Sequence, residues 1–438
     1  MLRPNFQTLN QFFHRTTLGA ALLLAISLPG LTAFAQTACY TPWSATTVYT
    51  GGQTASENNQ NYTADYWTQN QDPSSNSGAV GTGEPWIPDG SCGGAAASPY
   101  AQEAAEGVTT LQQWYVQSSG LYQSPTGWWN AANAITLLVN YSRVTGTTQY
   151  LSAVANTYAN ANAANGSQNF ITSANDDEGW WALAWVDAYD LTQNQNYLNT
   201  AETIFSDLTT QWDTTTCGGG VWWSKNLTTS AYKNAVTNEI FLKLAASLAN
   251  RVSDPTAKAQ YLSWANQEWQ WFQSSGMINS QNLINDGLNA TNPNACTNNG
   301  QTTWTYNQGV ILGGLVELNK ANQNSSLITT AQTIASATMT NLVTSNGILQ
   351  EPSISGPDQP QFKGIFMRNL MELDEASPQS QYQTFVDNNV NSIWQSDQGS
   401  NYEFGVYWQG PFDSGDATRQ TSALDAFVAA IEMEGNSQ

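Results

Sequence analysis

The stretch NFITSANDDEGWWALAWVDAYDLT, residues 169–192, decides the fold prediction for this chain. Two adjacent aspartates, Asp176 and Asp177, follow a short polar run and precede Trp180 and Trp181. Apolar residues with helical spacing come next. The stretch therefore predicts a helix that begins with two carboxylates, where free backbone N–H groups favour negative charge. Ordinary helix capping also produces Asp-Asp pairs, so the rest of the chain has to decide between structure and chemistry.

From Ala101 onward the chain repeats this helical pattern, and alternating β-branched segments are almost absent. Breaks between the helical runs are rich in Gly, Pro, Asn and Asp. Twelve helices are predicted, at 101–118, 128–145, 148–164, 177–192, 195–212, 232–252, 256–274, 305–321, 326–343, 363–376, 380–396 and 418–434.

Every second run opens with a polar and aromatic segment and then becomes small and apolar. These openings are GWWNAAN, NDDEGWW, YKNAVTNE, TYNQG, FKGIFMRN and TRQTSAL. They recur roughly every 50 to 70 residues, which indicates a repeat of helical hairpins. Six hairpins closed into a ring would place these helices inside, parallel, with their openings at one mouth. We therefore predict an all-α (α/α)6 barrel over residues 101–438, because the alternative, an open solenoid, would not gather the six openings.

Composition limits the possible functions. The chain has 438 residues, of which 40% are hydrophobic, enough for a large core, and only 10% are charged. Its formal net charge of −21 predicts no nucleic-acid partner, because the chain would repel phosphates. The single histidine, His14, lies in the N-terminal segment described next, so we expect neither Ser-His-Asp catalysis nor a histidine metal site. No metal or cofactor is expected, and carboxylates remain as the main acids and bases.

Residues 1–35 are typical of a signal peptide, with arginines, an apolar core and the small-residue site AFA ending at Ala35. We expect a secreted, monomeric protein without a membrane span or a lipid-anchor tail. Four cysteines in an exported chain indicate two disulfides. Three pairings are possible, and Cys39–Cys92 with Cys217–Cys296 is favoured because each bond then stays within one predicted domain.

Residues 39–92 differ from the rest, because they are rich in Gly, Thr and aromatic residues and have no helical period. TTVYTGG and NYTADYWTQ predict short strands. The motifs W-S-x-x-x-V-Y-x-G-G and Y-x-A-x-Y-W-T-Q resemble the small all-β carbohydrate-binding modules of families 5 and 12. That resemblance implies that Tyr66 and Trp67, with Trp43 as a weaker candidate, stack on chitin or cellulose. The alternative is that these rings only form a small core. Residues 93–100 are predicted to be a linker.

The helical part resembles the family-76 glycoside hydrolases, the endo-acting α-1,6-mannanases. The motifs GWWNAANAI, ANDDEGWWALAWVDAYDLT, CGGGVWWS, YKNAVTNEIFLKLAASLA, DGL and WTYNQGVILGGLVEL carry the resemblance. It implies retaining hydrolysis of α-1,6-linked mannan, with Asp176 as the nucleophile and Asp177 as the general acid/base. A retaining mechanism needs two carboxyl groups about 5–5.5 Å apart, which neighbours at a helix start can reach.

The polar and aromatic openings are also the expected substrate contacts, because such side chains suit sugar hydroxyls and ring faces. For each of them, capping or core packing is the alternative interpretation. The candidates in these openings are Trp128, Trp129, Asn130, Asn133, Asn175, Trp180, Asn234, Tyr306, Asn307, Gln308 and Lys363. Two candidates lie outside the openings: Asp286, on a loop before the eighth run, as a partner for a mannose hydroxyl, and Trp223 as a sugar platform.

Three other functions stay open from the sequence. A transglycosidase would use the same aspartates but pass the mannosyl unit to a sugar. A non-catalytic binding protein would not need both acids. An enzyme acting on chitin or cellulose would follow from the front module, but the motifs of the helical part favour mannan.

Overall fold

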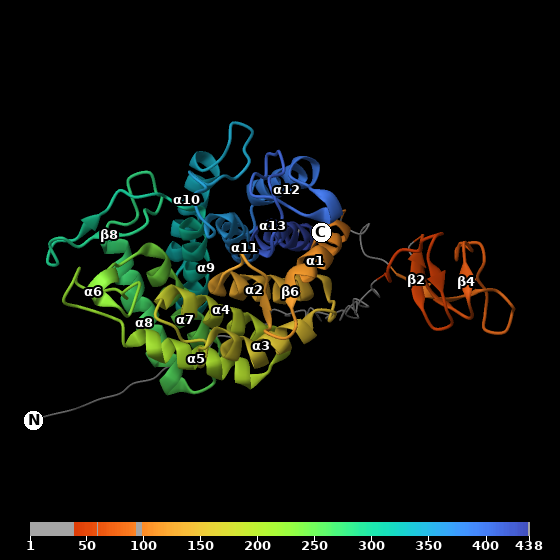
Figure 1. Ribbon diagram of the computed structural model, residues 1–438, viewed down its shortest axis with the longest axis horizontal. Helices are drawn as coiled ribbons and strands as arrows, with labels where there is room; N and C mark the ends of the chain where they lie inside the picture. Colours follow the sequence, from red (N-terminus) through yellow and green to blue (C-terminus); the bar gives the residue numbers. More distant parts are fainter. Residues whose placement is uncertain (1–38, 59, 93–98, 437–438) are drawn as a thin grey trace, which may run out of the picture. The chain divides into compact units, whose positions relative to one another are not determined.

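The computed structural model describes residues 39–58, 60–92 and 99–436 (Figure 1). The predicted signal peptide and most of the predicted linker lie outside these residues. The chain divides into two compact units, Met1–Ala96 and Ala97–Gln438, and each is described by itself.

The front unit is a small β module. Strands β2 (Thr54–Glu57), β3 (Gln60–Ala64) and β5 (Trp86–Ser91) form an antiparallel sheet in the order β2-β3-β5. Strand β1 (Val48–Tyr49) pairs with β4 (Thr68–Gln69). Trp86 is fully buried, and its ring meets that of Tyr49 edge-on at 4.9 Å. A disulfide joins Cys39 to Cys92. This bond stabilises a module whose core is too small to do so alone.

The second unit is helical, as predicted. Its long helices are α1 (Pro99–Leu111), α2 (Trp128–Thr145), α3 (Leu151–Asn165), α4 (Asn175–Thr192), α5 (Gln195–Thr209), α7 (Ala235–Arg251), α8 (Pro255–Ser274), α9 (Thr305–Asn322), α10 (Ser325–Asn341), α11 (Gln359–Ala376), α12 (Ser380–Ser396) and α13 (Ala417–Asn436). Each corresponds to one predicted run. Among the described helices, none combines the length and the apolar character needed to cross a bilayer.

The sequence interpretation missed several short elements and misplaced some helix ends. Helix α1 starts two residues earlier than predicted and ends at Leu111, where a 3-10 turn, Gln112–Trp114, leads into the ribbon β6 (Tyr115–Val116) and β7 (Leu121–Tyr122). Helix α11 begins at Gln359, because proline is tolerated in a first helical turn and Pro360 stands there. Short helix α6 (Leu227–Ser230) and the ribbon β8 (Leu288–Asn289) and β9 (Thr297–Asn298) lie in loops.

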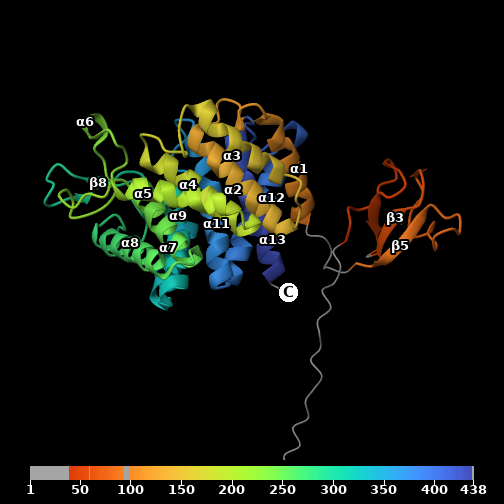
Figure 2. The same ribbon diagram turned by 90° about the horizontal axis from the view of Figure 1, so that it is seen from below.

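The inner helices close into a ring. In order, α2, α4, α7, α9, α11 and α13 each contact the next, and α13 contacts α2. The other six long helices pack outside them (Figures 1 and 2). Because outer and inner helices alternate along the chain, the six inner helices run parallel. The second unit is therefore an (α/α)6 barrel, as the sequence predicted.

Glycines let inner helices approach each other closely near their N-terminal ends. A Cβ at Gly309 of α9 would lie 2.6 Å from the Cα of Phe366 in α11. A Cβ at Gly364 of α11 would lie 2.5 Å from the carbonyl oxygen of Ser422 in α13. Both distances exclude a side chain, so the glycines of TYNQG and FKGIF set the helix spacing.

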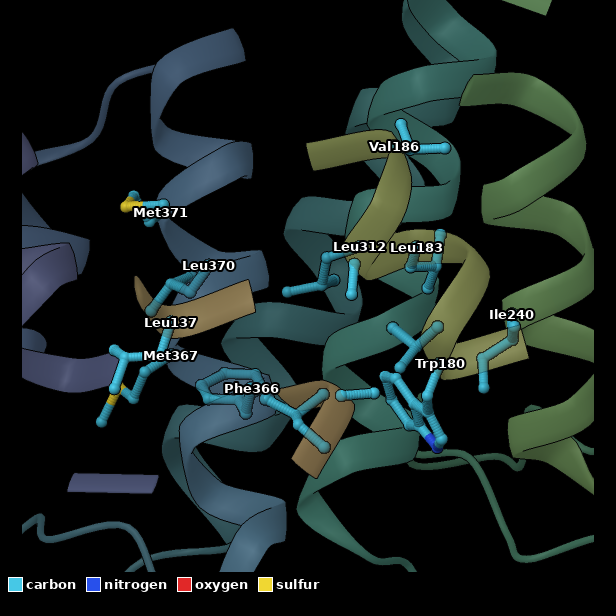
Figure 3. Packing of buried hydrophobic residues seen from close by; sticks show 14 of the residues in the cluster. Leu137, Trp180, Leu183, Val186, Ile240, Leu312, Phe366, Met367, Leu370 and Met371 are labelled. Atoms are coloured by element: carbon cyan, nitrogen blue, oxygen red, sulfur yellow. The ribbon is translucent and has the colours of Figure 1, made fainter. Parts of the chain in front are cut away.

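Below these contacts, apolar side chains from different inner helices pack in the barrel interior, beside a buried polar cluster that includes Arg368 and Asp425. Figure 3 shows Leu137 of α2, Leu183 of α4, Ile240 of α7, Leu312 of α9 and Leu370 of α11 converging in this core. We call the end formed by the N-terminal turns of the inner helices the mouth.

Candidate active site

The two aspartates stand in the first turn of α4, at the mouth. The backbone of the preceding residue, Ala174, is extended and forms an antiparallel bridge with Ser224. Asn175 is fully buried. Its backbone N–H donates to the carbonyl of Trp223 (2.9 Å), and its Nδ2 donates to that of Trp222 (2.7 Å). The loop between α5 and α7 thus fixes where α4 begins and how its carboxylates are presented. Asn175 therefore binds backbone carbonyls of this loop and holds the start of α4 in place.

The environments of the two carboxyls differ. Asp176 accepts a hydrogen bond from the indole Nε1 of Trp223 (3.1 Å). Burial raises the pKa of Asp176 to about 6, and this indole together with backbone N–H groups limits the rise. Burial raises the pKa of Asp177 well above its usual value, and the neighbouring charges of Asp176, Asp358 and Glu178 raise it further. The pair thus holds one group that ionises readily and one that keeps its proton.

The next acid, Glu178, belongs to the scaffold. Its side chain is buried and accepts hydrogen bonds from Lys225 Nζ (2.7 Å) and from the Thr172 N–H (2.9 Å). Burial raises its pKa to about 8, although Lys225 opposes the rise. Lys225 also binds Asp207 of α5 (2.6 Å). Glu178 therefore ties α4 to the loop that carries Trp223.

A row of aromatic rings from four inner helices lies beside the aspartates. Trp129 of α2 stacks on Trp180 of α4, with ring centroids 5.7 Å apart, and also contacts Phe362 of α11 (6.1 Å). Phe362 stacks on Tyr306 of α9 at 3.9 Å. Of these rings, Trp129 and Tyr306 are partly exposed. We call these four side chains the aromatic row. Trp128 is not part of the aromatic row, because its ring packs against those of Phe170 and Trp181.

Several polar candidates have structural partners. Asn130 Oδ1 accepts from the Gly127 N–H, and Asn234 caps α7 by accepting from the Thr237 N–H. Gln308 is fully buried and makes three hydrogen bonds, with the backbone N–H and carbonyl of Ile284 and with the Trp304 carbonyl. These contacts anchor loops around the mouth.

Three further candidates, Asp286, Tyr306 and Asn307, are polar residues at the mouth. Asp286, on the loop between α8 and α9, accepts from the Tyr232 hydroxyl (2.6 Å), and burial raises its pKa. The pKa of Tyr306 is raised by burial and by the charges of Asp286 and Asp176, so this hydroxyl stays protonated near both. Asn307 is fully buried, and neither its Oδ1 nor its Nδ2 has a hydrogen-bond partner among the described residues.

Two predicted substrate contacts, Lys363 and Asn133, have their side chains in the interior of the barrel domain. Lys363 is buried, with its Nζ 2.6 Å from the Val406 carbonyl and 4.0 Å from the centroid of the Trp408 ring. Burial lowers its pKa to about 7. Asn133 accepts from Arg368 (2.5 Å), which also pairs with Asp425 (3.1 Å). The Lys363 amine therefore points into the interior, toward the carbonyl that the neighbouring loop offers, and its predicted role as a substrate contact gains no support from this position.

The remaining predictions concern loops. A disulfide joins Cys217 to Cys296, the favoured pairing, and connects the loops that carry Trp223 and Asp286. In the front module, Tyr66 and Trp67 are 43% and 58% exposed. They lie in a bend between β3 and β4 rather than on the strand that the sequence NYTADYWTQ predicted, so both rings can be exposed. Trp43 is partly buried against the module core.

The sequence interpretation did not identify Asp358 or Phe362. Asp358 immediately precedes α11, and its Oδ1 accepts from Trp129 Nε1 (2.9 Å). The segment PDQPQF contains a usable pattern, an acid four residues before the aromatic residue that starts the opening FKGIFMRN, but Pro360 made the helix start appear later.

A closed (α/α)6 barrel with a carboxyl pair and an aromatic row at its mouth has the parts of a glycosidase that works with two acids. The model of glycosyl hydrolase family 76 matches residues 95–437, so the chain belongs to this family.

Similar proteins agree with this membership. Mannan endo-1,6-alpha-mannosidase DCW1 of Candida glabrata is 27% identical over 298 residues, 64% of this chain and 65% of the relative. A putative mannan endo-1,6-alpha-mannosidase of Schizosaccharomyces pombe is 29% identical over 262 residues, 56% and 58% of the two chains. The alignments thus span less than two thirds of either relative.

Solved structures share the fold. An inactive variant of the α-1,6-mannanase GH76A of Salegentibacter sp. HEL1_6, bound to α-1,6-mannotetrose, has a TM-score of 0.70 and 21% identity, covering 77% of this chain and all of that one. Dfg5 from Chaetomium thermophilum, in complex with glucosamine, has a TM-score of 0.67 and 18% identity, covering 77% and 90%.

Proposed function

We propose that this protein is a secreted, endo-acting glycoside hydrolase that cleaves α-1,6-mannosidic bonds of mannan with retention of configuration. The observation that carries the proposal is the adjacent pair Asp176 and Asp177, whose pKa values are raised to different extents beside an aromatic row. Family membership supports the reaction class. The substrate follows from the mannan-cleaving relatives and from the mannotetrose-bound Salegentibacter variant, in which two adjacent aspartates are replaced.

In the first step, the Asp177 carboxylic acid gives its proton to the glycosidic oxygen while the Asp176 carboxylate attacks C1. The C1–O bond breaks, the mannan chain on the leaving side departs, and a mannosyl ester of Asp176 forms. In the second step, the Asp177 carboxylate takes a proton from water. That water attacks C1, the ester bond breaks, and the product has the α configuration again.

The proton affinities support this division of roles. At neutral pH a carboxyl with a pKa of about 6 is mostly ionised, as attack requires. The more strongly raised pKa of Asp177 keeps its proton available for the leaving oxygen. Asp177 gives up this proton in the first step. Once the ester has formed, the negative charge of Asp176 is gone, which lowers the pKa of Asp177 and lets its carboxylate act as the base of the second step.

The aromatic row and the exposed Trp223 are the proposed sugar platforms, because flat rings cover the apolar faces of pyranoses. Asp286 and the Tyr306 hydroxyl are the proposed partners for mannose hydroxyls. The front module is proposed to hold the enzyme on chitin or cellulose through Tyr66 and Trp67, whose exposed rings support that role. Two disulfides support export to an oxidising compartment.

The test is product analysis of the wild-type protein on linear α-1,6-mannan, chitin and cellulose. We expect shortened α-1,6-manno-oligosaccharides only, with the α-anomer formed first in proton NMR. First formation of the β-anomer would overturn the retaining mechanism. Products longer than the starting oligosaccharide would identify a transglycosidase, and binding without cleavage would identify a carbohydrate-binding protein.

A further inference from the structure

The acidic side chain of Asp358 has an arrangement that helix capping does not explain. It occupies the N-cap position of α11, where an aspartate usually accepts a hydrogen bond from an N–H of the first turn. Here the side chain makes no cap hydrogen bond. Pro360 has no N–H to offer, and the Gln361 N–H is bound by the Asp358 backbone carbonyl (3.0 Å). The carboxylate is thus free to serve another group.

That other group is a ring of the aromatic row. Asp358 Oδ1 lies 2.9 Å from the indole Nε1 of Trp129, which comes from a helix 229 residues earlier in the chain. Four residues after Asp358, Phe362 contacts the same indole. Trp180 also stacks on this indole, with ring centroids 5.7 Å apart, and the Arg368 guanidinium lies 5.8 Å from the Trp180 ring centroid. The hydrogen bond to Asp358 therefore fixes the one polar atom of a ring that also contacts the rings of Trp180 and Phe362.

Asp358 also faces the reacting carboxyls. Its negative charge raises the pKa of Asp176, of Asp177 and of the Tyr306 hydroxyl. Other charged or titratable groups act on the same three: Glu178 from α4, Asp286 from the loop before α9, and Glu239 from α7. Lys225 forms an ion pair with Glu178 and partly neutralises its negative charge. Asp358 is the exposed member of this set.

We propose that Asp358 is a positioning residue of the mannanase site, which orients the Trp129 ring as a sugar platform through its hydrogen bond and places a negative charge beside the two aspartates. The proposal rests on the proposed function. It requires two separable effects, one that depends on the hydrogen bond and one that depends on the charge.

The experiment compares the kcat/KM pH profiles of three variants of the full chain on α-1,6-mannan. Asp358→Asn keeps a hydrogen-bond acceptor but removes the charge. We expect both limbs of its bell-shaped profile to move to lower pH by roughly half a unit to one unit, because both aspartates lose a like-charged neighbour. Trp129→Phe keeps the ring but removes the donor. We expect a KM about three- to tenfold higher and an unmoved pH profile.

Asp358→Ala should combine both effects. Asp254→Asn is the matched control, because Asp254 is also an exposed N-cap aspartate, at the start of α8, where the outer helix leaves the opposite end of the barrel. Its profile and KM should equal those of the wild type. Circular dichroism and the melting temperature of each variant report folding separately.

An unmoved pH profile in Asp358→Asn, or a wild-type KM in Trp129→Phe, would overturn the proposal. Either result leaves the proposed function intact if the wild type still cleaves α-1,6-mannan in the same assay. A wild type that does not cleave mannan would instead overturn the proposed function.

Discussion

At the scale of single residues, the site separates two identical side chains by their surroundings. Asp176 accepts an indole N–H and backbone N–H groups, which favour its ionised form. Asp177 has no such donor among the described residues and faces like charges instead. The difference arises because the indole of Trp223 and backbone N–H groups serve Asp176, whereas Asp177 is buried beside other carboxylates.

Replacing Asp177 by alanine tests its role. We expect turnover of α-1,6-mannan to fall about 100- to 10,000-fold, the usual contribution of a general acid. On an aryl α-1,6-mannobioside, whose leaving group needs no proton, added azide should restore turnover and give the α-mannosyl azide. Gas or thin-layer chromatography and NMR of the azide product check the result.

Asp176→Ala is the comparison variant. Azide should then replace the missing nucleophile and give the β-mannosyl azide. If the two variants yield azides of the same configuration, the assignment of nucleophile and acid is wrong.

At the scale of elements, the inner helices depend on contacts that only glycine allows. Gly309 stands where α9 meets the backbone of α11, and Gly364 where α11 meets α13. The same turns carry Tyr306 and Phe362 of the aromatic row. Helix spacing and ring spacing are therefore set by the same contacts.

Gly309→Ala tests this coupling. The added methyl group would overlap Phe366, so we expect a loss of about 1–3 kcal/mol in the free energy of unfolding. Gly435→Ala is the control, because a Cβ there meets nothing within 4 Å and alanine is the better helix former. Chemical denaturation of both variants gives the comparison. Equal stability of Gly309→Ala and the wild type would contradict the close approach.

At the scale of the whole molecule, the two ends of the barrel differ in how their charges are paired. The N-terminal mouth gathers carboxylates. The opposite end has a cavity of about 280 Å³ that is lined by both cations and carboxylates. Arg143, Lys243 and Arg251 pair there with carboxylates of other helices, and Lys320 pairs with Glu317 of its own helix. The helix dipoles favour these cations, because they lie near the C-terminal ends of inner helices.

Buried carboxyls give the protein an acidic stability optimum. Burial raises the pKa of Glu239 and Glu268 well above their usual value and that of Asp425 to about 7. The fold thus holds protons that the unfolded chain releases near pH 4, so its stability falls as pH rises from about 4 through 7. We expect the melting temperature to be about 5 °C or more higher at pH 5 than at pH 8. Calorimetry checks this, and Glu268→Gln should flatten the dependence. A melting temperature that rises toward pH 8 would contradict it.

The two units should separate in function. A chain that begins at Pro99 keeps the closed barrel and should hydrolyse soluble α-1,6-mannan at the wild-type rate. It should no longer sediment with chitin or cellulose. Full-length Tyr66→Ala/Trp67→Ala should show the same loss of sedimentation with unchanged hydrolysis. Retained binding by both proteins would assign adsorption to the barrel.

The sequence by itself determined the number, order and alternation of the long helices, because a helix with one buried face places apolar residues three and four positions apart. It also determined that two carboxylates begin an inner helix, and it favoured the disulfide pairing that the structure contains. These features depend on residues close together in the sequence, or on a helical hairpin that the chain repeats six times.

Only the tertiary structure decided which openings face the site. Ring closure brings Asp358 to Trp129 across 229 residues, and packing turns Lys363 inward to the Val406 carbonyl. A bend, not a strand, leaves both Tyr66 and Trp67 exposed. Each of these outcomes depends on a partner far away in the chain or on the geometry of a turn. The spacing of apolar residues along one helix contains no information about either.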